Sequence, residues 1–488
     1  MKNRINYILT AAFLFAGASA FGNIEVIDSL GEPQKWSDAT TWVEETKPTL
    51  ADEVFLQGEN TTLIVDGNSA TMKRFVIQDN QTLNLKGDGS GVLNLANTGT
   101  TSNSDFFQGS SESSVLNIYG GFEVASERGK NWSNLYFNNG SVNLIGGNGE
   151  TERAKIINNR RPSSSNAKTN LSYCGYITSG GIDGWAGGNI VFKENSNVIF
   201  SQIVNAWNGN AAFVFENNSA LEVAQGFKIT AVNSSLDIAG KITTKGAHEG
   251  FTFAAAKSTF RATAEIDQQL NANGVNYFNG NTTVESGVAV GALKFANDLY
   301  VGDNVKLTLN SSNAFNIGRV DESGALNAQS NSFIKIATVS GNTASHTFAA
   351  ANFTIENKAD NAFGGFEYYA GSSLTLILDS SKTLSIGAIS LLSDSPAGDF
   401  SIFLDCGQLG TDKLFLGSDI FADENIKFFD ATETSRELVA GADYVLREAE
   451  VNGVAGYYMN NPAVPEPATC AAIFGIFALA FTVWRKRR

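Results

Sequence analysis

Short stretches of alternating apolar and polar residues recur along most of this chain, and each follows a polar turn rich in Asn, Ser, Gly and Asp. The pattern begins near residue 52, and clear examples are Asp79–Leu85, Ser113–Ile118, Asn139–Leu144, Asn218–Val223 and Asn233–Ile238. Alternation with a period of two places successive side chains on opposite faces of a strand. The sequence therefore predicts many short β-strands, each with one buried face.

Equivalent strand positions recur at a nearly constant spacing. Leu236, Phe260, Val284 and Leu307 follow one another at almost equal steps, and Val198 precedes Leu221 by the same step. The step is in the low twenties, which is typical of one solenoid coil. We expect an all-β fold, a right-handed parallel β-helix (solenoid) over residues 52–393, with about fourteen coils at ~4.8 Å per strand. A β-sandwich array is the alternative, because turn signals at intervals of roughly 8–12 residues also occur.

Two flanking segments depart from this rhythm and are expected to close the ends of the solenoid. Residues 21–51 form an N-terminal cap, in which Trp36 and Trp42 cover the open end of the core; a sugar-binding aromatic platform is the other interpretation. The pattern Lys35–Trp42 resembles the entry segment of secreted β-helical adhesin-like proteins. Residues 394–461 form a C-terminal β cap that protects the last strand edge.

Residues 146–190 interrupt the repeat and are expected to form a protruding loop. They contain a Gly-rich stretch with Trp185 and a local basic cluster made up of Arg153, Lys155, Arg160, Arg161 and Lys168. Loops that protrude from a rigid scaffold often carry binding residues. We favour an insertion without a binding role, tolerated on one face of the solenoid, over a loop that binds a partner.

The N-terminal segment 1–20 has the three parts of a secretory signal peptide. Lys2 and Arg4 form the charged region, Ile8–Ala16 the apolar region, and the small residues Ala18 and Ala20 the cleavage site. Cleavage would leave Phe21 as the new N-terminus. The sequence thus predicts export through the Sec machinery.

The C-terminal segment 462–488 has an ordered set of three parts. Pro465, Glu466 and Pro467 precede the uncharged stretch Ala468–Trp484, and the chain ends in Arg485, Lys486, Arg487 and Arg488. The apolar stretch is near the lower limit for a transmembrane helix, and the terminal cations favour the cytoplasmic side.

This arrangement resembles the PEP-CTERM sorting signal. The resemblance covers only the segment Val464–Arg488. It implies that exosortase, a membrane-embedded protease, recognises Pro465–Pro467 and processes the chain there. It implies sorting, not activity. An ordinary single-span anchor is the alternative.

Charge and cysteine content limit the partners of the exported body. The chain has 34 Lys+Arg and 49 Asp+Glu, a net charge of −15; without the six cations of the terminal signals, the body 21–467 has 28 against 49 and carries −21. Such acidity disfavours nucleic acid as a binding partner.

Cys174 and Cys406 are expected to be free, buried thiols, since successive coils would separate them, although one disulfide is the alternative. No Cys/His pattern indicates a metal site or a cofactor.

The function expected from these features is that of an exported cell-surface or extracellular-matrix protein with a structural or adhesive role, not of an enzyme. Its partners would be exosortase, the Sec machinery, the membrane and an extracellular polysaccharide. It would begin as an inner-membrane-anchored precursor. The alternative is a polysaccharide-acting lyase or hydrolase, which needs carboxylates clustered on neighbouring coils. The candidates Glu216, Glu222 and Asp237 are scattered in sequence.

Overall fold

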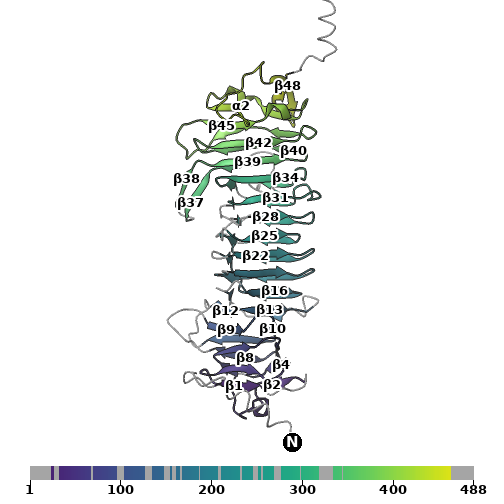
Figure 1. The fold of residues 1–488 in the computed structure, drawn as a ribbon, viewed down its shortest axis with the longest axis vertical. Helices are drawn as coiled ribbons and strands as arrows, with labels where there is room; N and C mark the ends of the chain where they lie inside the picture. The colour runs from purple at the N-terminus through teal and green to yellow at the C-terminus, as the bar shows by residue number, and fades with distance from the viewer. Residues whose placement is uncertain are drawn as a thin grey trace, which may run out of the picture.

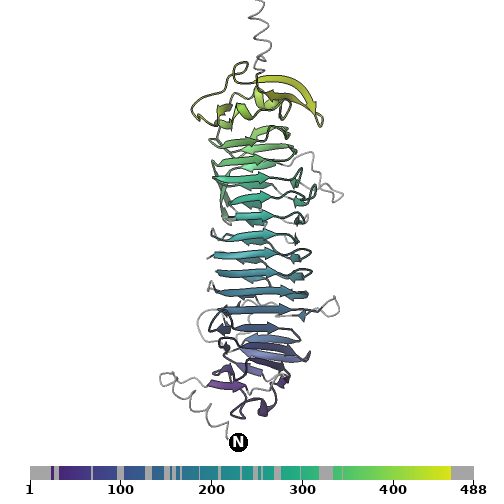
Figure 2. The same cartoon turned by 45° about the vertical axis from the view of Figure 1, so that its right-hand side comes forward.

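Parallel strands stack along a single rod in the computed structural model, with the N-terminal strands at one end and the C-terminal strands at the other (Figure 1). Figure 2 shows the same rod turned by 45°, with strands that run across its long axis at successive levels. The structure describes residues 23–26, 32–67, 70–95, 104–126, 134–147, 154–155, 161–164, 168–185, 187–206, 210–230, 233–245, 251–253, 257–268, 276–296, 298–317, 333–342 and 345–462.

Among the described residues, one sheet of sixteen strands, here called the long sheet, runs the length of the rod. Adjacent strands within this sheet run parallel to one another. In spatial order they are β2 (Gln34–Lys35), β4 (Asn60–Val65), β7 (Thr82–Gly87), β10 (Val115–Ile118), β13 (Gly140–Ile145), β16 (Thr169–Cys174), β19 (Gly187–Phe192), β22 (Asn210–Phe215), β25 (Ser235–Ile238), β28 (Lys257–Phe260), β31 (Asn281–Val284), β34 (Val305–Leu309), β39 (Asn352–Asn357), β42 (Ser373–Leu378), β45 (Phe400–Leu404) and β47 (Ile426–Asp430).

The second face of the rod consists of a six-stranded sheet followed by a nine-stranded sheet. The first contains β1 (Asn23–Val26), β3 (Glu53–Leu56), β6 (Arg74–Ile77), β9 (Ser104–Gly109), β12 (Asn134–Asn138) and β15 (Arg161–Ser163). The second contains β18 (Ile182–Asp183), β21 (Val204–Ala206), β24 (Phe227–Ile229), β27 (Phe251–Phe253), β30 (Asn276–Phe278), β33 (Leu299–Val301), β36 (Phe333–Ile336), β41 (Gly365–Tyr368) and β44 (Ile389–Leu391).

The third face is divided into three sheets. The first contains β5 (Ala70–Met72), β8 (Gly91–Leu95) and β11 (Phe122–Ser126). The next contains β14 (Ala154–Lys155), β17 (Tyr176–Ser179), β20 (Asn197–Phe200), β23 (Ala220–Val223), β26 (Lys241–Thr244), β29 (Glu265–Gln268), β32 (Leu293–Phe295) and β35 (Phe315–Ile317). The last contains β40 (Asn361–Phe363), β43 (Leu384–Ile386), β46 (Leu414–Gly417), β49 (Val454–Asn460) and β48 (Val445–Val451).

The chain visits the three faces in turn, so three consecutive strands make one coil and each strand pairs with the strand one coil later. This is the architecture of a parallel β-solenoid, and the all-β prediction is confirmed. The sandwich alternative is wrong, because it requires antiparallel sheets, whereas parallel ladders join the coils. Within residues 52–393, the described chain contributes thirteen strands to the long sheet, β4 to β42, near the expected number of coils.

The predicted pairing of strand positions is correct in part. Val198 pairs with Leu221 and Phe260 with Val284, as the spacing predicts. Leu236 pairs with Ser258 instead of Phe260, and Val284 pairs with Leu309 instead of Leu307. Both errors are shifts by two positions, which leave the same side chains facing inward.

The polar turns bend the chain through left-handed residues just before the strands of the next face. Asn80, Asn139, Asn195, Asn218 and Asn304 have φ angles of 57° to 65°. Asparagine tolerates this conformation because its short side chain bonds locally to the backbone. The recurrent Asn in the sequence is therefore a requirement of the corners of the coil.

Aromatic rings from successive coils stack inside the rod. Phe192 lies between Tyr173 and Phe215, with ring centroids 4.9 Å and 4.3 Å away and ring planes within 7° of parallel. All three side chains are buried. Nearer the N-terminus, Trp36 and Phe75 pack edge to face with centroids 6.1 Å apart. The core is thus a continuous column, not a set of separate clusters.

The predicted N-terminal cap supplies strands and rings to the first coil. β1 pairs with β3 and β2 pairs with β4, and the short 3₁₀ helix η1 (Ala39–Thr41) lies between Trp36 and Trp42. Both tryptophan side chains are fully buried, with ring centroids 5.0 Å apart. The tryptophans therefore cover the core, and the interpretation of an exposed sugar-binding platform is wrong.

The C-terminal end of the rod changes from parallel to antiparallel pairing. β45 and β47 still extend the long sheet beyond residue 393, with the 3₁₀ helix η3 (Cys406–Gln408) and helix α2 (Ser418–Ala422) between them. The hairpin β48–β49 then pairs antiparallel with β46. Its turn residues Asn452 and Gly453 both have positive φ, typical of a two-residue hairpin turn.

The expectation of a protruding loop across 146–190 is wrong where the structure describes that segment. β16, β17 and β19 continue the coils, and the Trp185 side chain is fully buried. A Cβ atom on Gly188 would lie 1.6 Å from the Thr169 carbonyl oxygen. The glycines here let coils approach closely. Of the basic cluster, Lys155 and Arg161 lie in β14 and β15, Lys168 is exposed, and Arg153 and Arg160 lie outside the described residues.

The predicted terminal segments cannot be located in this fold. The signal peptide 1–20 and residues 463–488 of the sorting segment lie outside the described residues. Within the part of the chain that is described, no helix has the length and apolar character needed to cross a membrane.

Replacing Phe192 with alanine should destabilise the rod strongly, because the substitution removes a buried ring from between two stacked neighbours. We expect a loss of about 3–5 kcal/mol in unfolding free energy, measured by urea unfolding of the full chain. Val290→Ala, at a position that is 75% exposed, is the control and should change stability by less than about 0.5 kcal/mol. Equal unfolding midpoints for the two variants would contradict the stacked core.

Candidate functional site

The carboxylates considered for catalysis each contact a cation one coil away. Arg261 lies between Asp237 and Glu285, with N–O distances of 2.7 Å and 2.5 Å. Glu216 contacts Lys193 at 3.0 Å, and Glu222 contacts Lys245 at 2.5 Å. The structure does not bring Glu216, Glu222 and Asp237 together. Each contributes instead to the bonding between neighbouring coils.

Glu356, in β39 of the long sheet, has a carboxylate that pairs with two lysines. Its Oε2 lies 2.5 Å from Lys306 Nζ, its Oε1 lies 2.8 Å from Lys358 Nζ, and Thr308 donates a hydrogen bond of 3.0 Å. The hydrogen bonds from Lys306 and Lys358 outweigh burial and lower the pKa of Glu356 to about 2. The group is therefore ionised at all ordinary pH values.

A ladder of asparagine side chains, here called the asparagine ladder, runs along the outer surface of the first coils. The side-chain amide of each residue donates to the amide oxygen of the preceding one: Asn84 to Asn60 at 2.7 Å, Asn117 to Asn84 at 2.9 Å, and Asn143 to Asn117 at 2.8 Å. This asparagine ladder was not among the features predicted from the sequence. The signal was present, because Asn occupies the same place in the repeated strands Leu83–Leu85, Leu116–Ile118 and Val142–Leu144.

On the second face, a hairpin packs on Tyr300, whose ring also lies beside the partly buried Lys335. Lys335 Nζ lies 2.8 Å from Asp298 and 3.1 Å from Glu367. Burial opposes its charge, but the hydrogen bonds to these carboxylates prevail and raise the pKa of Lys335. Phe348 of the hairpin β37 (Thr338–Asn342) and β38 (Ser345–Ala349) stacks on Tyr300, with centroids 5.6 Å apart. This cluster fixes the hairpin against the rod.

The third face opens between β35 and β40, although the long sheet is continuous at the same level. β34 and β39 pair there along their length, Val305–Leu309 with Phe353–Asn357. β35, however, is the last strand of one sheet and β40 the first strand of the next. Two consecutive coils therefore stay joined on one side of the rod and separate on another.

Two asparagines bridge the start of this opening. The Asn313 backbone N–H donates to Asn361 Oδ1 at 2.9 Å, and the Ala362 backbone N–H donates to Asn313 Oδ1 at 3.0 Å. Asn313 has a φ angle of 47°, which directs the chain into β35. Side-chain amides here take the place of a strand ladder.

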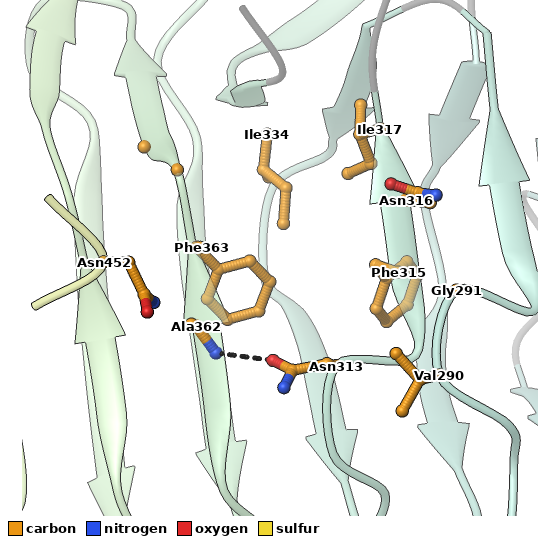
Figure 3. Close-up of a pocket in the computed structure, with 12 residues that line it drawn as sticks. Val290, Gly291, Asn313, Phe315, Asn316, Ile317, Ile334, Ala362, Phe363 and Asn452 are labelled. Carbon is orange, nitrogen blue, oxygen red and sulfur yellow. Dashed lines mark hydrogen bonds between the residues drawn. The ribbon is translucent and has the colours of Figure 1, made fainter. Parts of the chain in front are cut away.

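Beyond this bridge lies a cavity of about 450 Å³, here called the β35–β40 cleft. The half-buried rings of Phe315 and Phe363 point toward one another across it, with Ile334 at its inner side (Figure 3). Phe315 stacks on Phe295 with centroids 6.4 Å apart, and Phe363 packs on Phe366 at 5.3 Å. The core therefore holds both rings in place.

Polar groups of the cleft come from side-chain amides. Asn316 lies beside Phe315, and Asn452 reaches the cleft from the turn of the hairpin β48–β49 (Figure 3). Within the described part of the chain, neither side-chain amide has a hydrogen-bond partner. All the residues that line the cleft are uncharged. The cleft thus offers two rings and free amide donors and acceptors to a neutral ligand.

The two described cysteines are free thiols, as the sequence analysis expects, and are only half-buried. Burial raises the pKa of the Cys174 thiol, and burial together with Asp443 and Asp430 raises that of Cys406 to about 11. A raised pKa keeps the thiols protonated and unreactive near neutral pH.

The remaining predicted site residues lie at the ends of the chain. Ala18 and Ala20 of the signal cleavage site, and Pro465, Glu466, Pro467, Arg485, Lys486, Arg487 and Arg488 of the sorting signal, fall outside the described residues. Among the residues that are described, no three His, Cys, Asp or Glu side chains gather as they would to hold a metal ion.

Comparison of the chain with protein-family models, curated proteins and solved structures finds no match.

Glu356→Gln should make stability less dependent on acid. The folded pKa of Glu356, about 2, is below that of an unfolded glutamate, ~4.3. The charged group therefore stabilises the fold fully above pH ~4.3, and this contribution disappears as pH falls toward 2. We expect the variant to lose about 1–2 kcal/mol at pH 7, after allowing for solvent screening, and to approach wild type at pH 2.

Thermal unfolding across this pH range would measure the effect. Glu424→Gln is the matched control, because Glu424 is exposed and has no ion pair among the described residues. It should behave as wild type throughout. A deficit in Glu356→Gln that is the same at pH 7 and pH 2 would contradict the assigned ion pairs.

Alkylation should find Cys174 and Cys406 free without prior reduction. We expect iodoacetamide to label both in the unfolded, unreduced chain and to label both slowly in the folded chain at pH 8, because their pKa values are raised. Peptide mass spectrometry would measure the labels. A peptide pair joined through Cys174 and Cys406 would show that the disulfide alternative is correct.

Proposed function

We propose that this chain is an exported β-solenoid protein of the cell surface or extracellular matrix, with a structural or adhesive role, sorted by exosortase. In this proposal the coils wind right-handed. The Sec machinery exports the chain, the helix Ala468–Trp484 anchors the precursor in the inner membrane, and processing follows at Pro465–Pro467. The terminal signals supply the sorting half of the proposal, and the rod supplies the structural half.

The observation that carries the structural role is the bonding of outward polar groups along the rod. Asp237, Arg261 and Glu285 form one chain of ion pairs across successive coils, and Asn60, Asn84 and Asn117 form a chain of amide hydrogen bonds. These side chains join coil to coil. Such use of surface groups suits a protein whose task is to keep an extended shape.

The alternative of a polysaccharide-acting enzyme receives less support from these residues. Glycoside hydrolysis needs two carboxyl groups held roughly 5–10 Å apart on either side of the substrate bond. Glu216, Glu222 and Asp237 are each engaged by a cation from a neighbouring coil. Such pairing binds each carboxylate to a neighbouring coil and does not leave it directed at a substrate.

The sorting half of the proposal is tested by the mass of the mature protein. We expect protein recovered from the cell surface or medium to begin at Phe21 and to end near Pro467, with the precursor that ends at Arg488 confined to the membrane fraction. Intact mass and the C-terminal peptide measure this. A surface protein that retains Arg488 would leave an ordinary anchor as the explanation.

A variant pair makes the assignment specific. Replacing Pro465, Glu466 and Pro467 with alanine should accumulate the unprocessed precursor, because exosortase would no longer recognise the chain. Pro462→Ala, just before the motif, is the matched control and should be processed normally. Equal processing of both variants would remove the motif from the proposal.

A further inference from the structure

We propose that the β35–β40 cleft binds a neutral saccharide. This inference rests on the proposed surface role, because a displayed rod meets the polysaccharides of the cell exterior. The site itself is argued from the cleft, whose opposed rings and free amides match the two kinds of surface on a sugar.

The rings of Phe315 and Phe363 provide the apolar half of the match. A pyranose has a flat face of C–H groups, which packs on the negative face of an aromatic ring. The two rings point toward each other across the cleft (Figure 3). Because Phe295 and Phe366 support them from within the rod, a sugar would meet rings that are already in place.

The amides of Asn316 and Asn452 provide the polar half. A side-chain amide both donates and accepts hydrogen bonds, as a sugar hydroxyl does. Both amides lie at the cleft, and neither is used by another described residue. Asn452 sits in a hairpin turn far from β35 in sequence, so the C-terminal hairpin completes the site.

Charge and size select the class of saccharide. Every residue that lines the cleft is uncharged, and the exported body carries −21, so an acidic sugar would be repelled and no cation in the lining would offset the repulsion. A cavity of about 450 Å³ falls within the range of small-ligand sites, roughly 300–1,000 Å³. These properties favour one or two neutral sugar units of a longer chain.

The break in the sheet also explains why a ligand fits here and not where neighbouring strands of the third face pair. Where strands pair, as β32 and β35 do, neighbouring coils are in contact along the ladder. Between β35 and β40, the Asn313 bridge holds only the start of the two strands. The glycines Gly364 and Gly365 leave the far wall without side chains.

Calorimetric titration of the purified full-length chain would test the proposal. The probes are neutral hexasaccharides of glucose, mannose, galactose and xylose, with hexagalacturonate as the charged comparison. The detergent should be zwitterionic, because a maltoside headgroup would compete for the site. We expect at least one neutral hexasaccharide to bind and hexagalacturonate to bind at least tenfold more weakly.

Variants locate the binding. Phe363→Ala and Asn316→Ala should each weaken binding at least tenfold, and Tyr119→Ala, which removes an aromatic ring that is 36% exposed elsewhere on the rod, should leave it unchanged. Circular dichroism and the thermal midpoint check the fold. Asn316 is on the surface of the cleft, so its variant remains informative if Phe363→Ala proves unstable.

Three outcomes would overturn the proposal. They are the absence of binding by all four neutral hexasaccharides to the folded wild-type chain, unchanged binding by Asn316→Ala and Phe363→Ala, and a preference for hexagalacturonate. Self-association of the chain that these two variants abolish would instead assign the cleft to a second copy. None of these outcomes affects the processing at Pro465–Pro467, which is measured separately.

Discussion

The parallel in-register stacking of coils is the constraint on which the rest of this structure depends. Each strand pairs with the strand one coil later, so each side chain faces the side chain at the equivalent position of its neighbour. Inside the rod, this brings ring onto ring, as for Tyr173, Phe192 and Phe215. Outside, like charges at equivalent positions would repel, and the chain instead places Arg261 between Asp237 and Glu285.

The strands and the coil can be predicted from the sequence, but the register in which strands of successive coils pair cannot be predicted completely. Alternation reports which side chains face inward, and a shift by two positions preserves that pattern. Leu236 could therefore be matched to Phe260 although it pairs with Ser258. The glycines near Trp185 suggested a loop for a related reason: composition does not distinguish a flexible segment from one where backbones touch, as Gly188 and Thr169 do.

The candidate cleft could not be predicted from the sequence pattern. Phe315 and Phe363 come from two coils whose strands in the long sheet pair Leu307 with Ile355. The separation of these two residues in the sequence is twice the usual repeat length, so the repeat length does not predict that the two rings are neighbours. Asn452 arrives from a third segment. The cleft opens because a ladder is missing at this level of the rod, and the absence of pairing leaves no mark in the hydrophobic pattern. The predicted terminal signals are the opposite case, because they are recognised from the local order of residue types alone.

The direction of the hydrogen bonds has a mechanical consequence. The ladders between coils run along the axis of the rod, so tension between its two ends would load them in series and open them one coil at a time. A coil such as the one between the paired residues Val198 and Leu221 would release on the order of 75 Å of chain at roughly 3.4 Å per extended residue. A rod built in this way yields by stepwise lengthening under load and does not fail in a single event.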